Sequence, residues 1–287
     1  LSHNADIGLG NIIGSNIFNI LFVLGLAAVI RPVVIQRSIV RRDIPILLGV
    51  SILFYLLVLN GHLGILESIM LILILTGYLY YSSRVMHERF DADLREPEDA
   101  RESVSGRQLT RLFALIAVSL ALLILASQWM VSAAVSIAGS FGLSEFVIGL
   151  TIVAVGTSLP EIATTVAAVR QGQHELAVGN VMGSCLFNLV AIPAAMTLVG
   201  SSSLPVAREA ITIDIPVMIA AVVACMPIFF SGHRISRPEG ALFLAYYAIY
   251  VLMLYYRSSS ESIVGRYRVE LEFLLLPIVV ITMAVIT

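Results

Sequence analysis

Charged residues are scarce in this chain. Asp, Glu, Lys and Arg make up 13% of its 287 residues, whereas hydrophobic residues make up 59%. A soluble globular domain contains about a quarter charged residues. The scarcity of charge therefore excludes an ordinary soluble domain and predicts an all-α membrane protein with several spans. The net charge of −2 says little about such a protein, because charge matters loop by loop. We expect no nucleic-acid partner.

Cysteine is nearly absent, and lysine is absent altogether. The two cysteines, Cys185 and Cys225, lie inside apolar stretches, so their number and spacing exclude a disulfide framework and a cysteine metal cluster. We expect both to be small buried thiols. All 17 basic residues are Arg, a bias for which the sequence offers no functional reason.

Enzymatic and targeting motifs are also missing. The sequence has no Gly-x-Ser-x-Gly, no His-Glu-x-x-His and no pair of Asp residues inside a span, so we expect neither an enzyme nor a cofactor. The five histidines lie in connectors or near span ends, without the spacing of metal ligands. No signal peptide is visible, and the chain starts at Leu1 close to a repeated motif, so we expect further spans upstream.

Long apolar runs are what the sequence has in abundance. Each is long enough to cross about 30 Å of hydrocarbon, and turn-forming residues separate them. Eight runs are predicted to be spans: 7–30, 44–60, 63–83, 111–135, 146–169, 175–199, 211–231 and 239–256. A ninth run, 271–287, follows a charged connector and is expected to be an additional span or a helix along the membrane.

Arginine is concentrated on one side of the predicted spans. Thirteen of the 17 arginines fall in the connectors 31–43, 84–111, 170–175 and 232–238. By the positive-inside rule, these connectors are cytoplasmic. The longest of them mixes acidic residues with Arg, which is typical of a solvated linker.

The linker divides the chain into two bundles. We expect residues 1–85 to be the remainder of a first transmembrane repeat and residues 86–110 to be a cytoplasmic linker. Residues 111–256 are expected to form a second transmembrane repeat. Residues 257–287 would then hold a charged connector and the possible extra helix.

One polar motif occurs twice within the apolar sequence. It reads Gly-Asn-Ile-Ile-Gly-Ser at 10–15 and Gly-Asn-Val-Met-Gly-Ser at 179–184. The copies fall on the first and sixth predicted spans, so they cross the membrane in opposite directions. The triplet Asp-Ile-Pro also recurs, at 43–45 and 214–216. The pattern predicts an inverted-topology repeat, an architecture found in secondary transporters.

Glu161 is the only charged residue within its predicted span. An unpaired carboxylate at that depth is costly, so it must face a polar cavity, a cation or a proton. Thr157 and Ser158 lie four and three residues earlier, on the same helix face. Pro160 removes an N–H and is expected to free carbonyls one turn earlier, including that of Ala154. Such hard oxygen ligands suit Na⁺ and Ca²⁺. The alternative is a protonated Glu161 hydrogen-bonded to a neighbouring helix.

The two motif copies add a hydroxyl and an amide each. Ser15 and Asn19 stand four residues apart on one helix face, and so do Ser184 and Asn188. We expect all four to contribute to a cation site.

The two copies also contain glycines and a second asparagine each. The glycines of both copies are expected to allow close helix packing in lipid. Asn11 and Asn180 could cap broken half-helices or approach the site, and the sequence leaves both open.

The Gly-Thr-Ser-Leu-Pro-Glu stretch at 156–161, with the two motif copies, resembles the alpha repeats of the sodium/calcium exchanger family in the cation/calcium antiporter superfamily. The resemblance covers nearly the whole chain. It implies two inverted halves of five helices, with ions bound at mid-membrane by four core helices while two peripheral helices slide over them. By this comparison the first half is truncated at its N-terminus by about two spans, which should supply a partner to Glu161.

The resemblance also assigns ion ligands. Those implied are Glu161, Thr157, Ser158, Ser184, Ser15 and Asn19, with the carbonyl of Ala154 as a further candidate. Asn188 stands where several characterised exchangers have an acid. The site would then carry one negative charge less, which bears on ion stoichiometry and on Na⁺ dependence.

The function implied is secondary active antiport in the plasma (inner) membrane, with Ca²⁺ extruded on the inward Na⁺ gradient. Ca²⁺ and Na⁺ would be the substrates, and the lipid bilayer the surroundings. One alternative is H⁺/Ca²⁺ or K⁺-dependent exchange. Another is a membrane scaffold that transports nothing.

Overall fold

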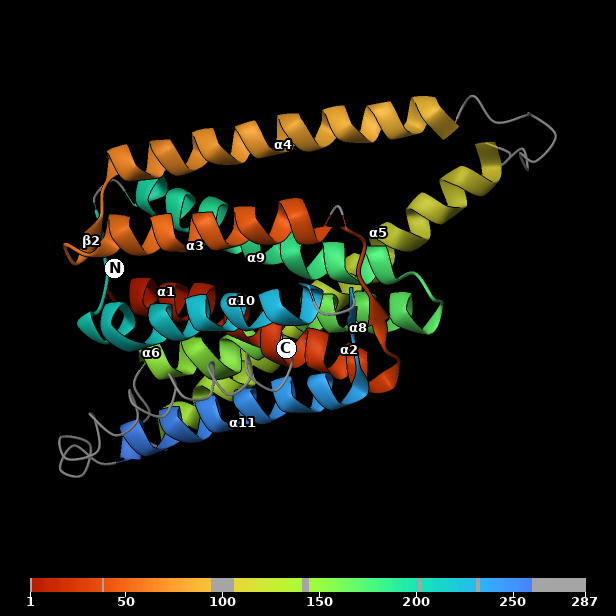
Figure 1. Ribbon diagram of the computed structural model, residues 1–287. Coiled ribbons are helices and arrows are strands. Elements are labelled where there is room, and N and C mark those ends of the chain that lie inside the picture. The colour runs from red at the N-terminus through yellow and green to blue at the C-terminus, as the bar shows by residue number, and fades with distance from the viewer. Residues whose placement is uncertain are drawn as a thin grey trace.

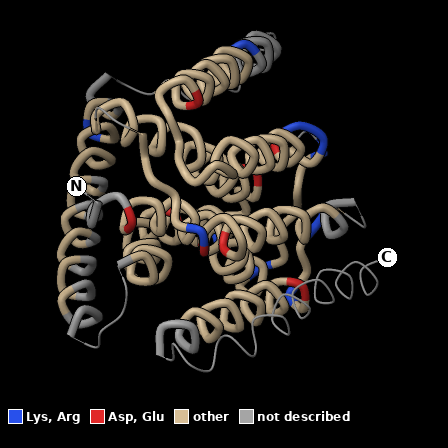
Figure 2. Tube along the Cα trace, turned by 90° about the vertical axis from the view of Figure 1, so that its left-hand side faces the viewer, with Lys and Arg blue, Asp and Glu red and all other residues tan. Residues whose placement is uncertain are grey.

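The computed structural model of this chain describes residues 2–37, 39–93, 106–140, 145–200, 203–230 and 233–259. Its helices run roughly side by side (Figure 1) and, seen end-on, form one bundle with few charged residues (Figure 2). The first half holds α1 (Ser2–Ile17), the π-helical turn η1 (Phe18–Val23), α2 (Leu24–Ile30), η2 (Ile39–Asp43), α3 (Ile44–Val58) and α4 (Ile65–Asp93). The second half holds α5 (Gly106–Ser140), α6 (Glu145–Ile148), η4 (Gly149–Val153), α7 (Ala154–Thr157), α8 (Leu159–Arg170), α9 (His174–Val199), η5 (Ala210–Asp214), α10 (Ile215–Phe230) and α11 (Arg237–Ser259).

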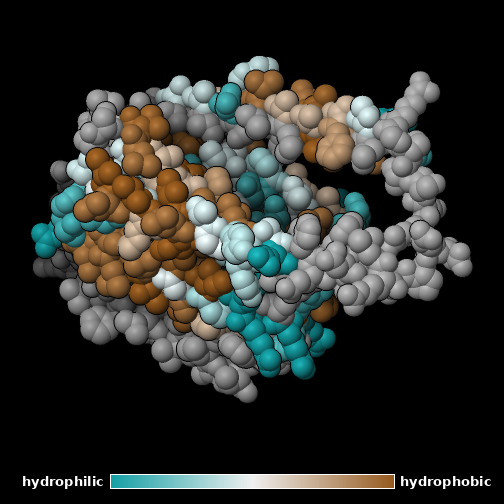
Figure 3. Space-filling model, turned by 90° about the horizontal axis from the view of Figure 1, so that it is seen from above, coloured by the Kyte–Doolittle hydropathy of each residue, from teal (hydrophilic) through white to brown (hydrophobic). Residues whose placement is uncertain are grey.

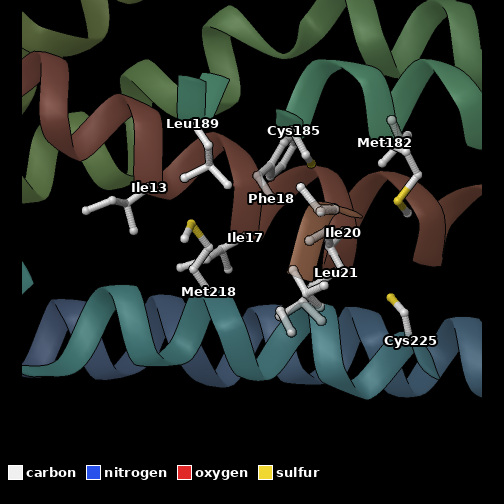
Figure 4. Close-up of a cluster of buried hydrophobic side chains, with 14 of the residues drawn as sticks. Ile13, Ile17, Phe18, Ile20, Leu21, Met182, Cys185, Leu189, Met218 and Cys225 are labelled. Atoms are coloured by element: carbon white, nitrogen blue, oxygen red, sulfur yellow. The ribbon is translucent and has the colours of Figure 1, made fainter. Parts of the chain in front are cut away.

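The span built from α1, η1 and α2 is the centre of the bundle. In its candidate membrane segment Asp6–Ile30, 83% of the most apolar stretch is buried, against 11% in Ile65–Arg84 of α4. A helix that is apolar on every side is expected to be surrounded by other helices. Figure 4 shows Ile17 of this span beside Met218 of α10, and Phe18 of the same span beside Cys185 of α9. Both cysteines are buried, as predicted.

Helix α4 lies at the outside of the bundle (Figure 1). Large apolar side chains on it, such as Leu66 and Leu73, are exposed, which fits a face turned toward lipid tails. Figure 3 shows a broad hydrophobic area on this side of the molecule, with hydrophilic residues toward its ends and in a hollow near the middle. This distribution is that of a protein whose helices cross a bilayer.

The two repeats are joined crosswise by short strands. β1 (Val33–Val34) pairs antiparallel with β4 (Arg234–Ile235), and β2 (His62–Leu63) pairs antiparallel with β3 (Leu204–Pro205). Each ladder joins a connector of the first repeat to a connector of the second. Because β1 and β2 flank α3 at its two ends, the repeats are held together at both ends of the bundle. The fold is the inverted repeat that the sequence predicts.

The glycines of the two motif copies behave differently. A Cβ atom added at Gly10 or Gly14 would come within 2.5 Å of a backbone carbonyl oxygen in α6 or η4. The close packing predicted for this copy is therefore confirmed. A Cβ at Gly179 or Gly183 would meet no atom of the described residues within 4 Å, so the structure shows no such packing at the second copy among these residues.

The predicted spans and the linker between them differ from the structure in three respects. The span 146–169 is not one helix but a bent pair, and the predicted linker 86–110 is entered from both sides by α4 and α5. Among the described residues, three helices alone are long and apolar enough to cross a membrane, or four if the bent pair is one span. The predicted run 271–287 lies outside the described residues.

Candidate functional site

The predicted site centres on a break between α7 and α8. The helices on either side are bent by 43°, and Ser158 stands at the break with φ −95° and ψ 7°. Pro160 is the second residue of α8, where its missing N–H costs nothing and its ring prevents the helix from continuing backward. Ser158 itself is buried.

The carbonyl of Ala154 is not released by this break. It accepts the backbone N–H of Ser158 at 3.2 Å. The expectation that Pro160 frees this carbonyl is therefore not met, because the turn before the break closes through Ser158 instead. Ala154 remains a candidate ligand only through the second lone pair of its oxygen.

Glu161 lies in the first turn of α8, where the helix dipole favours a negative charge. The hydroxyl of Ser184 donates to its Oε1 at 3.1 Å. The other carboxyl oxygen, Oε2, is buried and has no hydrogen-bond partner in the described part of the chain. A buried carboxylate oxygen without a donor is costly unless a cation or a proton meets it.

Asn19 completes this first group. Its Nδ2 donates to the Ser184 hydroxyl oxygen at 3.4 Å, and the whole residue is buried. Its amide oxygen, like Oε2 of Glu161, is a buried acceptor that finds no donor among the described residues. Ser184 thus joins two side chains that each present one unused oxygen, which is the composition of a hard-cation site.

Ser15 and Asn188 form the counterpart of this group. Asn188 Nδ2 donates to the Ser15 hydroxyl oxygen at 3.3 Å, and the Ser15 hydroxyl donates to the backbone carbonyl of Asn11. These residues occupy the same motif positions as Asn19 and Ser184, with the repeats exchanged. Two matching amide-to-hydroxyl bonds therefore cross between the repeats.

Thr157 reaches the other repeat by a different route. Its hydroxyl donates to the side-chain oxygen of Asn11 at 2.8 Å and lies 3.0 Å from the carbonyl of Val153. All eight predicted site residues therefore lie on the three spans that meet here. Hydrogen bonds between helices join five of them into two separate groups, one of Glu161, Ser184 and Asn19 and one of Ser15 and Asn188.

Two asparagines near the site were not among the predicted ligands. Asn180 Nδ2 donates to the Thr165 hydroxyl at 3.2 Å and lies 3.5 Å from the carbonyl oxygen of Glu161. Asn16 is buried, its Nδ2 donates to the carbonyl of Ile12 at 2.7 Å, and its Oδ1 has no partner in the described residues. Comparison of the two motif copies does not point to Asn16, because the equivalent position in the second copy is Cys185 and not a polar residue.

The chemistry available is that of one acid among neutral oxygens. The described residues hold no group of three or more His, Cys, Asp or Glu side chains able to bind a metal. Hydroxyl, amide and carboxylate oxygens are poor ligands for soft metals and good ones for Na⁺ and Ca²⁺.

Comparisons with known proteins place these features in context. The sequence model of the family described as "Sodium/calcium exchanger protein" matches residues 1–84 and 111–256. Inner membrane protein YrbG of Escherichia coli is 30% identical over 262 residues, covering 90% of this chain and 80% of YrbG. The sodium/calcium exchanger MaX1 of Methanosarcina acetivorans is 30% identical over 286 residues, covering 88% and 81%. The solved structure of the sodium-calcium exchanger NCX_Mj, soaked with Na⁺ and Sr²⁺, matches with a TM-score of 0.65 at 27% identity, covering 87% and 77%.

Proposed function

This chain belongs to the sodium/calcium exchanger family, and from that premise we propose that it exchanges Na⁺ for Ca²⁺ across the plasma membrane, extruding Ca²⁺ on the inward Na⁺ gradient. The family is one of antiporters, so the chain is a transporter and not an enzyme. It is a multi-pass membrane protein, and its likeness to a protein named for the inner membrane supports the plasma membrane as its location.

The unused oxygen of Glu161 is the observation that carries this proposal. Oε2 is buried beside Ser184 and Asn19, without a donor in the described residues. Ionisable side chains inside a membrane protein generally mark the path of an ion or a proton. A dehydrated cation would supply the missing partner to Oε2 and to Oδ1 of Asn19 together.

Exchange would follow from competition for this carboxylate. Ca²⁺ and Na⁺ both prefer oxygen ligands, so the ion that occupies Glu161 excludes the other. Ser184 holds Oε1 through its hydroxyl hydrogen, which leaves Oε2 as the oxygen that meets the ion. A transporter of this class needs one site that faces the two sides of the membrane in turn.

Proton-coupled Ca²⁺ exchange is the second candidate. Glu161 is the only acid among the proposed ligands, since Asn188 contributes an amide at the motif position equivalent to Asn19. A proton on Oε2 would satisfy the same buried oxygen that a cation would. K⁺-dependent exchange and a scaffold without transport are the remaining alternatives.

Ca²⁺ uptake into inverted membrane vesicles containing the full-length protein tests the coupling ion. We expect uptake to require an outward-directed Na⁺ gradient from the vesicle lumen and to persist when the pH gradient is collapsed. Uptake that stops with the pH gradient and ignores Na⁺ would establish the proton-coupled alternative. A requirement for K⁺ in the same assay would establish K⁺-dependent exchange.

Replacement of the carboxylate tests the site itself. Glu161→Gln keeps the shape of the side chain and removes its charge, so we expect Ca²⁺ uptake to fall at least 100-fold, on the order expected for loss of about 3 kcal/mol of cation binding, with normal membrane insertion. Glu175→Gln, which removes an exposed acid that accepts a hydrogen bond from Gln36, is the matched control and should transport normally. Undiminished uptake by Glu161→Gln would contradict the role of Glu161 as the ion ligand, whereas absence of uptake in the wild type on every gradient would favour the scaffold.

A further inference from the structure

Two asparagines at the same motif position, Asn11 and Asn180, contact opposite sides of the broken helix. Asn11 on α1 accepts the hydroxyl of Thr157 at the end of α7. Asn180 on α9 donates to Thr165 and approaches the carbonyl of Glu161, both in α8. We propose that these two asparagines are positioning residues for the cation site, Asn11 acting through the Thr157 hydroxyl and Asn180 through the backbone of Glu161. The inference rests on the proposed transport function.

Asn11 offers the Thr157 hydroxyl an acceptor outside its own helix. A threonine inside a helix usually donates to the carbonyl four residues earlier, and Thr151 and Thr164 do so at 2.7 and 2.8 Å. At Thr157 the distance to the Val153 carbonyl is 3.0 Å, and the shorter contact, 2.8 Å, is with Asn11.

A hydroxyl has one hydrogen and two lone pairs. When the hydrogen of Thr157 is given to Asn11, the lone pairs of its oxygen turn away from Asn11 and are free to bind a cation. The carbonyls of Val153 and Ala154, otherwise acceptors for this hydroxyl, keep a lone pair available as well. Asn11 therefore sets the ligand character of the last turn of α7.

Asn180 acts on the other side of the break. Helix α9 holds Glu161 at two points: Ser184 donates to the carboxylate, and Asn180, one turn earlier, bonds the turn of α8 that carries it. Thr165, the stronger partner of Asn180, is buried. The direction of the Glu161 side chain is thereby fixed from both its ends.

The two contacts together fix the geometry of the break. Because α7 and α8 meet at 43° around Ser158, each half could tilt separately, and a shift of about 1 Å in a ligand position is enough to weaken binding strongly. Asn11 belongs to the first repeat and Asn180 to the second. The positions of Thr157 and Glu161 are therefore set by different halves of the protein.

The two roles require opposite chemistry, which allows a sharp test. Asn11 serves as an acceptor and Asn180 as a donor toward the Glu161 carbonyl, so aspartate can replace the first and cannot replace the second. The experiment measures the Ca²⁺ dependence of uptake by the full-length protein in vesicles, separating KM from maximal rate. Ca²⁺-dependent thermal stabilisation of the purified protein is recorded in parallel as a binding measurement.

We expect Asn11→Leu and Asn180→Leu each to raise the KM for Ca²⁺ about tenfold, the factor that loss of one hydrogen bond can produce in a binding constant. Asn11→Asp should stay within about twofold of the wild type, while Asn180→Asp should behave like Asn180→Leu. Asn60→Asp, in an exposed loop, controls for an added acid and should leave KM unchanged. If a Leu variant does not fold, the difference in KM between Asn11→Asp and Asn180→Asp still tests the proposal.

Equal KM values for all variants and wild type would overturn the inference while leaving the proposed transport intact. So would equal losses in Asn11→Asp and Asn180→Asp. If the wild-type protein takes up no Ca²⁺ under any of the gradients tested, the proposed function is overturned. The thermal-shift measurement would then decide the positioning roles by Ca²⁺ binding alone. Failure of the wild type to bind Ca²⁺ in that measurement would overturn both.

Discussion

Ser184 is a single hydroxyl that serves two neighbours from different parts of the fold. It donates its one hydrogen to the Glu161 carboxylate and accepts the amide of Asn19. Its counterpart Ser15 also accepts an amide, that of Asn188, but donates to a backbone carbonyl rather than to an acid. Equivalent serines in the two repeats therefore donate to acceptors of different charge, a carboxylate for Ser184 and a neutral carbonyl for Ser15.

This difference predicts unequal effects of serine removal. Ser184→Ala leaves Oε1 of Glu161 and the Asn19 amide without their partner, so we expect the KM for Ca²⁺ to rise ten- to thirtyfold, in line with about 1.5–2 kcal/mol for a bond to a charged group. Ser15→Ala breaks a neutral bond and should raise it only about threefold. Vesicle uptake at varied Ca²⁺ measures both. Equal effects would show that the two hydroxyls contribute alike.

For single residues, the sequence was enough to propose which side chains belong to the site, but not which hydrogen bonds they form. Ser184, Asn19 and Glu161 could be proposed because each stands out as polar in an apolar span. The bond between Thr157 and Asn11 could not, since it joins residues 146 positions apart. The carbonyl of Ala154 was expected to be free, because the sequence cannot show that the Ser158 N–H turns back to it.

Helix α1 approaches η4 closely enough for backbones to touch. A Cβ at Gly14 would lie 2.2 Å from the carbonyl oxygen of Leu150, and one at Gly149 would lie 2.5 Å from that of Ile7. Glycines on both sides of one contact let the motif of the first repeat lie directly against the span that carries Glu161.

Gly14→Ala adds only one methyl group, but we expect it to lower the stability of the folded protein strongly. The added methyl meets backbone atoms that cannot rotate away, so we expect a loss of about 2–3 kcal/mol in stability and a clear fall in the Tm of the purified protein. Gly77→Ala in α4, where a Cβ would meet nothing within 4 Å, is the control and should leave the Tm unchanged or slightly raised. A normal Tm for Gly14→Ala would mean that the helices can separate at little cost.

The long elements were predictable, and their irregularities only in part. Apolar runs located α3, α9 and α11 to within a few residues, because the hydrophobic thickness of a membrane sets their length. For α4 they located the apolar part, Ile65–Arg84, but not its extension to Asp93. Pro160 indicated a kink, but not that the helix would divide into α7 and α8. The π-helical turns were not predicted, since a single extra residue in a turn leaves the apolar pattern of a buried helix unchanged.

The whole molecule depends on pairing between repeats as much as on packing within them. The repeated motif and the alternation of arginine were sufficient to predict two inverted halves. The ladders β1–β4 and β2–β3 were not predicted, because strands of two residues have no periodicity from which to identify them.

A disulfide across one ladder tests whether it stays closed during transport. Val34 and Arg234 are direct partners in the register and both are exposed, and cross-strand neighbours have a Cα separation within the range for a disulfide. We expect Val34→Cys/Arg234→Cys to form the bond on oxidation and to keep most of the exchange activity, measured against each single-cysteine variant. Loss of uptake on oxidation, recovered with reductant, would show that the ladder opens.

The crosswise ladders limit how water can reach the buried carboxylate. A carrier whose halves are joined at both rims cannot admit solvent by swinging one half away from the other as a rigid body. If the ladders stay closed during the proposed transport, access would come from a sideways displacement of helices outside the joined frame. Helix α5 is such a helix, since it packs on η4, α7 and α8 and belongs to neither ladder. The gate of this protein would then be a lateral one, opened at the lipid boundary.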